Sequence, residues 1–142
     1  MPDLKQLEAI ATELIETFEI NAPPVPIESM LQYPKADMWR EVDINQLSGS
    51  FISIKEHYSP RMSLARLLAR HVVTSAWGNQ RGLSELRHDE AMLRAFARML
   101  IMPAGMVRAL SSGARTPTAM SMHFEVPEED ARLRLEELAD HL

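Results

Sequence analysis

The 142-residue sequence contains no cysteine. The lack of thiols excludes disulfide frameworks, thiolate zinc sites, iron–sulfur clusters and thiol nucleophiles. The sequence also lacks an apolar run near the roughly 18 residues of a membrane helix, and its first residues, MPDLKQLEAIATELIE, carry charges where a secretory leader would be apolar. We therefore expect a cytoplasmic protein without a membrane partner.

Length and composition favour one globular unit. A chain of 142 residues matches a single domain at roughly 100–200 residues per domain. Hydrophobic residues make up 46% and charged residues 25%, which is enough apolar surface for a core and no case for disorder. We expect a single domain over residues 1–142, with residues 116–142 as a helical C-terminal tail.

The net charge of −5 hides a segregation of charge along the chain. Residues 1–60 carry 4 Lys or Arg against 10 Asp or Glu, and residues 116–142 carry 2 against 7. Residues 61–115 carry 9 arginines, no lysine and only 3 acidic residues. Arginine pairs with carboxylates and phosphates through several donors at once. The pattern favours acidic flanks folded against a basic centre, and leaves an anionic partner as the alternative.

Periodicity and helix-capping residues predict a mostly helical chain with one small sheet. Apolar residues at helical spacing follow Asp3, and Ser59 with Pro60 is typical of a helix start at which the serine caps free amides. A short strand is expected at GSFISIK, within a region from Asp37 to Lys55 that fits two or three strands. The fold class is therefore α+β. The expected helices are 4–19, about 27–31, 60–77, 88–101 and 104–110, with two more beginning at 117 and 127.

Three segments carry a family resemblance. They are RMSLARLLARHVV from Arg61, EAMLRAFARMLIMP from Glu90 and HFEVPEEDARLRLEEL from His123. Their order and pattern resemble the ImmA/IrrE zinc metallopeptidases, some of which cleave a helix-turn-helix repressor. The resemblance implies a zincin-like metallopeptidase fold with two central helices, a small two- or three-stranded sheet and the C-terminal helical tail.

The residues that would bind zinc in that family are replaced. Such a site needs two histidines one helical turn apart, a glutamate between them as base, and a further carboxylate ligand. The family alignment places Arg66 and Arg70 at the histidines and Leu67 at the glutamate. The family's two glutamates on the next helix fall on Glu90 and Met92, and which of these is the ligand position stays open. A guanidinium offers no lone pair to a metal, so we expect no metal, no cofactor and no catalysis.

Arg66 and Arg70 can replace the ion electrostatically. They lie at i and i+4, on one face of the expected helix. We predict that they reach across to Glu90, or to the nearby Asp89 or Glu85, to form a charge-assisted pair where the metal would be. The alternative is that both extend into solvent, where such pairs contribute little.

Other candidate chemistry is weaker. Glu85 and His88 have the spacing of one half of a carboxylate-bridged metal site in a helical bundle, but no second copy exists. His71 follows Arg70 out of phase and fits a histidine at the edge of the core or the surface better than a ligand. No G-x-S-x-G, P-loop or G-x-G-x-x-G motif occurs.

The expected function is a metallopeptidase-like protein without catalytic activity that binds or regulates another protein. Arg66, Arg70, Glu90, His71 and Met92 mark its degenerate cleft. The partner expected from the resemblance is a transcriptional regulator or an active family member, and a homodimer is a further expected assembly. The alternative function is a nucleic-acid-associated regulator that uses the arginine-rich centre, which the acidic tail disfavours by repulsion.

Overall fold

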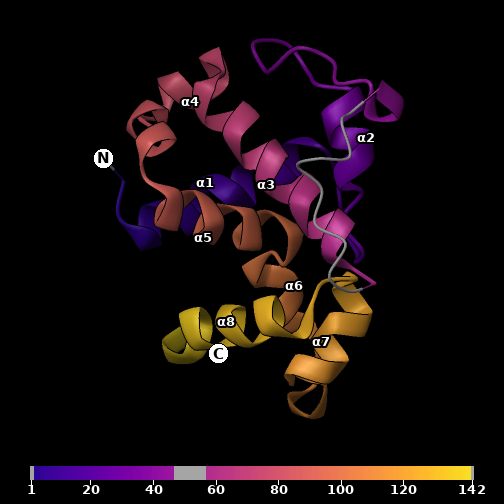
Figure 1. The fold of residues 1–142 in the computed structure, drawn as a ribbon. Helices are drawn as coiled ribbons and strands as arrows, with labels where there is room; N and C mark the ends of the chain where they lie inside the picture. Colours follow the sequence, from indigo (N-terminus) through magenta and orange to yellow (C-terminus); the bar gives the residue numbers. More distant parts are fainter. Residues whose placement is uncertain (1, 47–56, 142) are drawn as a thin grey trace.

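The computed structural model describes residues 2–46 and 57–141, and every regular element in them is a helix. Short 3-10 turns join the α-helices at η1 (Ile44–Gln46), η3 (Ser84–His88), η4 (Ser112–Ala114) and η5 (Ala139–His141). The α-helices, in the order shown in Figure 1, are α1 (Leu4–Thr17), α2 (Ile27–Gln32), α3 (Ser59–Thr74), α4 (Ala76–Gln80), α5 (Glu90–Ile101), α6 (Ala104–Ala109), α7 (Pro117–Phe124) and α8 (Glu128–Leu138).

The first helix begins as the sequence predicts. The Asp3 side chain accepts a hydrogen bond from the backbone N–H of Gln6, and the Gln6 side chain accepts one from the N–H of Asp3, which forms a reciprocal capping box. Leu7, Ala11 and Leu14 repeat at helical spacing and are buried. This apolar face lies against α5.

The expected long helix from Pro60 is divided in two. α3 starts at Ser59 with Pro60 in its first turn, but the predicted serine cap is wrong, because Tyr58 holds the cap position without a side-chain hydrogen bond. The Ser75 hydroxyl ends α3 by donating to Val72 O, and it starts α4 by accepting from Gly78 N–H. A Cβ on Gly78 would lie 2.1 Å from Val72 O, so glycine allows α4 to fold back closely on the end of α3.

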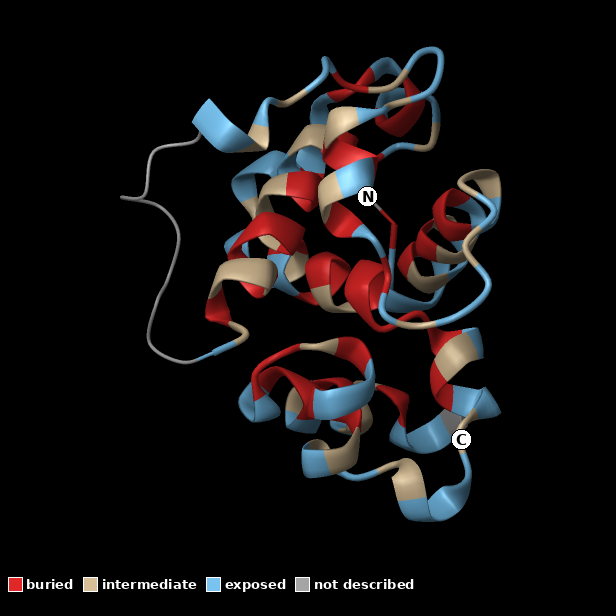
Figure 2. Cartoon of the chain, turned by 90° about the vertical axis from the view of Figure 1, so that its right-hand side faces the viewer, coloured by how far each residue is buried: buried red, intermediate tan, exposed pale blue. Residues whose placement is uncertain are grey.

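α3 and α5 lie against each other in the centre of the molecule (Figure 1). The Asp89 side chain caps α5 by accepting a hydrogen bond from Met92 N–H, close to the expected start at residue 88 or 89. Buried residues line the inward sides of these helices (Figure 2). The pairing of the two central helices is the part of the expected architecture that positions the candidate site.

The expected α+β class with a small sheet is wrong. Residues 2–46 and 57–141 contain no strand, and the part of the proposed sheet region that they include is turns, loop and η1. That segment is held by burial of Trp39, whose Nε1–H donates to Met30 O, and by Val42 N–H, which donates to Leu31 O. Side-chain packing on α2 therefore replaces strand pairing there. The strand expected at residues 49–55 lies outside the described residues.

The C-terminal part is helical, as expected. α7 and α8 pack against each other, and α8 also contacts α5. Glu125 ends α7 in the left-handed conformation, with φ 57°, and Pro127 then precedes the first turn of α8. This turn brings Asp130 towards α3, where it meets the candidate site.

Candidate functional site

The packing of α3 against α5 brings Arg70 and Glu90 together. Nη2 of Arg70 lies 2.5 Å from Oε1 of Glu90, and the two side chains are 50% and 60% exposed. Glu90 occupies the first turn of α5, where the positive end of the helix also favours its charge. The ion pair predicted between these helices is therefore confirmed for Arg70.

The corresponding prediction for Arg66 is wrong. Its Nη2 lies 3.7 Å from Oδ1 of Asp130 in the first turn of α8, and not beside Glu90. Nε of Arg66 is buried and has no hydrogen-bond partner in the described part of the chain. Arg66 and Arg70 therefore share a helix face but point to different acidic residues, one on the C-terminal helices and one on α5.

Met92 of the expected degenerate cleft, and Leu67 at the position of the family's base, pack against the hydrophobic core. Leu67 and Met92 are both half-buried and pack against the core cluster. A glutamate at position 67 would act as the base in a metallopeptidase, whereas the leucine side chain only adds apolar packing. Glu90 and Met92, the two candidates for one ligand position, therefore have different surroundings. Glu90 is exposed and pairs with Arg70, whereas Met92 packs against the core.

His71 lines a cavity of about 280 Å³ between the end of α3 and η3. The other lining residues are Arg70, Val73, Thr74 and Arg87. His71 is half-buried, and this burial lowers its pKa below the ordinary value, so the neutral imidazole is favoured. The expectation of a histidine at the edge of the core fits this position.

We call three arginines the arginine face: Arg70 and Arg87, which line this cavity, and Arg94 on α5. Arg70 and Arg87 line the cavity, and Arg94 lies one helical turn beyond Glu90 on α5. Arg87 and Arg94 are exposed, and neither has a carboxylate partner among the described residues. This face therefore presents two cationic groups without a carboxylate partner among the described residues, those of Arg87 and Arg94, beside the Arg70 group that pairs with Glu90.

Other arginines of the basic centre pair with the acidic flanks. Arg61 bonds Glu28, Arg81 bonds Glu13 and Arg98 bonds Glu137, each through two hydrogen bonds. Arg61 also donates to three carbonyls, those of Val25, Phe124 and Glu125, and so ties the loop before α2 to the end of α7. Acidic flanks folded against a basic centre, the favoured interpretation of the charge segregation, are confirmed.

Sequence reasoning missed Arg134 on α8. Its side chain is fully buried. It donates through Nε to Met102 O at 2.9 Å and forms a bidentate ion pair with Glu8 on α1. Its position in the sequence could have indicated this burial, because Arg134 lies between Ala131 and Leu138 on the apolar side of α8. It joins α1, the end of α5 and α8.

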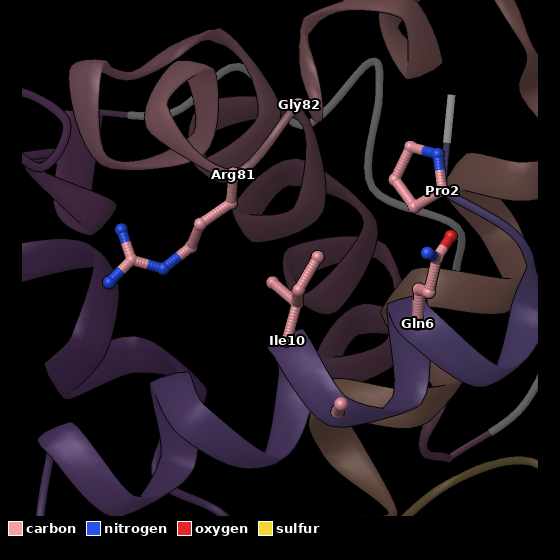
Figure 3. A pocket seen from close by; sticks show the side chains of 6 residues that line it. Pro2, Gln6, Ile10, Arg81 and Gly82 are labelled. Carbon is pink, nitrogen blue, oxygen red and sulfur yellow. The ribbon is translucent and has the colours of Figure 1, made fainter.

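A larger cavity, of about 560 Å³, lies between α1 and the end of α4. Pro2, Gln6, Ala9, Ile10, Arg81 and Gly82 line it. Figure 3 shows the guanidinium of Arg81 pointing away from Pro2 and Gln6. That group stacks on Trp77, 3.8 Å from the ring centroid, and bonds Glu13. The cavity therefore offers few groups for chemistry.

Comparisons with known proteins found no matching family model, no matching curated protein and no matching solved structure. Among the described residues no group of three or more His, Cys, Asp or Glu side chains could hold a metal ion. A search of the same residues for a long apolar helix that could cross a membrane also found none. The site is therefore defined by its own residues, with the α3–α5 ion pair at its centre.

Proposed function

We propose that the protein is a non-catalytic, protein-binding relative of the ImmA/IrrE metallopeptidases that acts in the cytoplasm. The observation that carries the proposal is the Arg70–Glu90 ion pair between α3 and α5. It stands between the two helices that, by the resemblance, would supply the zinc ligands. A fixed cation on one helix and a carboxylate on the other balance each other there without a metal.

The donor set does not fit the zinc ion that the resemblance implies. A guanidinium group has no lone pair to offer a metal, and this applies to both Arg66 and Arg70. Leu67 packs against the core where the base would stand. We therefore derive no hydrolytic step, and the retained helix pair supports binding instead.

Charge supports a protein partner over a nucleic acid. Arg61, Arg81 and Arg98 are already paired with acidic flanks, and Arg66 lies beside Asp130. Nucleic-acid binding requires many free cations along a polyanion. The arginine face, in contrast, offers a few cations on a chain with a net charge of −5, which suits a short acidic segment of a protein. By the resemblance, that protein is a transcriptional regulator or an active peptidase of the family.

Affinity capture with charge-reversal variants tests this function. The full chain is used as bait in extracts of the cells that produce it, as wild type, as Arg87→Glu/Arg94→Glu, and as the control Arg40→Glu/Arg132→Glu, which reverses two exposed arginines elsewhere. We expect a partner retained by wild type and control, with recovery on the order of tenfold lower for the arginine-face variant, because close like charges repel.

Two results would contradict the proposal. One is an identical set of recovered proteins for all three baits. The other is recovery that disappears on nuclease treatment, which would favour the nucleic-acid alternative. Size-exclusion chromatography with light scattering on the same three proteins tests the expected homodimer, since a face used for self-association would change the mass of the arginine-face variant alone.

A further inference from the structure

We propose that the cavity between α3 and η3 binds a phosphate monoester group between Arg70 and Arg87. This site goes beyond the proposed function, since it concerns a small ligand and stands on the cavity alone. The cavity measures about 280 Å³, slightly below the roughly 300–1,000 Å³ of sites for drug-sized ligands. It therefore fits a single charged group better than a whole nucleotide.

The two guanidinium groups supply the donors. Arg87 donates through Nε to Nε2 of His88 at 3.1 Å, and its terminal nitrogens have no partner in the described part of the chain. Arg70 uses Nη2 for Glu90 and keeps its other nitrogens without a partner there. Arginine pairs suit phosphate because each planar fork can donate two parallel hydrogen bonds to it.

The remaining lining groups define the other walls. The Thr74 hydroxyl donates to backbone carbonyls of α3, so its proton is not available to an anion. His71 is half-buried, and its ring keeps one N–H donor when neutral. Val73 provides apolar surface. The cavity thus combines two cations, a neutral donor and an apolar wall.

The end of α3 and Glu90 oppose the anion, and both are weaker than the arginines. The end of α3 beside the cavity carries roughly half a negative charge, against two full positive charges. Glu90 competes for Arg70, but both side chains are at least half exposed, and an ion pair of this kind contributes little. A doubly charged phosphate can therefore displace Glu90 from Arg70.

Calorimetric titration of the full chain at constant ionic strength tests the site. The probes are inorganic phosphate, phenyl phosphate and benzoate, titrated into wild type, Arg87→Gln, Glu90→Gln and the control Arg40→Gln, which changes an exposed arginine in the loop after α2. We expect saturable binding of phenyl phosphate, about tenfold weaker in Arg87→Gln because charge-assisted hydrogen bonds are lost. Arg40→Gln should bind as wild type, and Glu90→Gln should bind more tightly because the competing carboxylate is gone.

The probes separate the sources of the phosphate. Inorganic phosphate that binds as well as phenyl phosphate indicates a site for free phosphate, and tighter phenyl phosphate indicates an esterified ligand such as a phosphorylated side chain. Equal weakening by Arg87→Gln and Arg40→Gln, benzoate that binds as tightly as phenyl phosphate, or no saturable binding overturns the proposal. Circular dichroism of each variant shows that a loss of binding is not a loss of fold.

Discussion

The arginines of this protein differ in burial, and their expected roles differ with it. Arg134 is fully buried and bonds both a carboxylate and a carbonyl. Arg98 is 12% exposed and pairs with Glu137, whereas Arg70 is 50% exposed. Pairs removed from water are screened less and cost more to break than pairs in solvent. Arg134 is therefore expected to stabilise the fold, and Arg70 to interact with molecules that bind at the surface.

Replacing Arg134 tests this distinction at a single residue. Arg134→Met should destabilise the fold by about 3 kcal/mol, because Glu8 and the Met102 carbonyl lose their buried donor. Urea denaturation followed by circular dichroism measures the loss. The control Arg132→Met removes an arginine two residues earlier, whose pairs with Glu129 and Glu136 are exposed, and should change little.

The double variant Glu8→Gln/Arg134→Met gives the second check. Removing the carboxylate as well should recover part of the stability, since no charge is then left without its partner. Equal stability of Arg134→Met and Arg132→Met would show that Arg134 does not hold α8 to α1 and α5.

At the scale of elements, the sequence predicts helix positions well where local signals act alone. Asp3 and Asp89 cap their helices near the expected residues because a capping side chain bonds the backbone a few residues away. The end of α3 is also set by contacts within a few residues, but the spacing of apolar residues does not reveal them. Ser75 and Gly78 end it together, and Gly78 does so through its close approach to the Val72 carbonyl.

The sheet was wrong for a related reason. Trp39 and Val42 were interpreted as part of a short strand region, but an apolar residue in a short segment is buried equally well by packing on a helix. Only part of the candidate site could be predicted from the sequence. The i, i+4 spacing placed Arg66 and Arg70 on one face, but it could not show that the first turn of α8 brings Asp130 to Arg66.

The geometry of α3 against α5 can be tested by restoring metal ligands. The variant Arg66→His/Leu67→Glu/Arg70→His places two imidazoles one turn apart on α3, the one at position 70 next to Glu90 on α5 and the one at position 66 on the side of Asp130. If these helices have the proposed relation to a metallopeptidase site, it should bind one Zn²⁺ with Glu90 as a further ligand. Adding Glu90→Gln should then weaken zinc binding on the order of tenfold, measured by competition with a chromogenic chelator.

The wild type is the matched reference for that measurement. It should bind no stoichiometric zinc when purified without chelator, since arginines hold both positions. Zinc affinity in the triple variant that does not depend on Glu90 would mean that the histidine pair alone binds the ion, and that α5 does not face it as a ligand helix.

At the scale of the whole molecule, acidic flanks and a basic centre hold each other. Glu13 and Glu28 come from the first 60 residues and Glu137 from the tail, and each pairs with an arginine of the centre. Because these pairs join distant parts of the chain, acid should weaken several links at once. Protonation removes the negative partner and leaves 15 lysines and arginines to repel one another.

For Glu13, the direction in which stability changes with pH can be stated and measured. The hydrogen bond from Arg81 lowers the pKa of Glu13, so the folded protein holds this carboxylate ionised to lower pH than the unfolded chain does. The resulting stabilisation is present above the unfolded value of about 4.3 and is lost as pH falls through the lower folded value. Wild type should therefore lose free energy of unfolding below about pH 4.3 more steeply than Glu13→Gln, in urea denaturation at a series of pH values.

Glu16→Gln is the control for this prediction, since Glu16 is exposed on the same helix and has no arginine partner among the described residues. It should follow the wild-type pH dependence, because its removal leaves the bond between Arg81 and Glu13 in place. At neutral pH, Glu13→Gln should already be less stable than Glu16→Gln, and the two should converge in acid as Glu13 is protonated. Parallel curves for the two variants would show that the flank and the centre are held together by packing, with no contribution from this pair of charges.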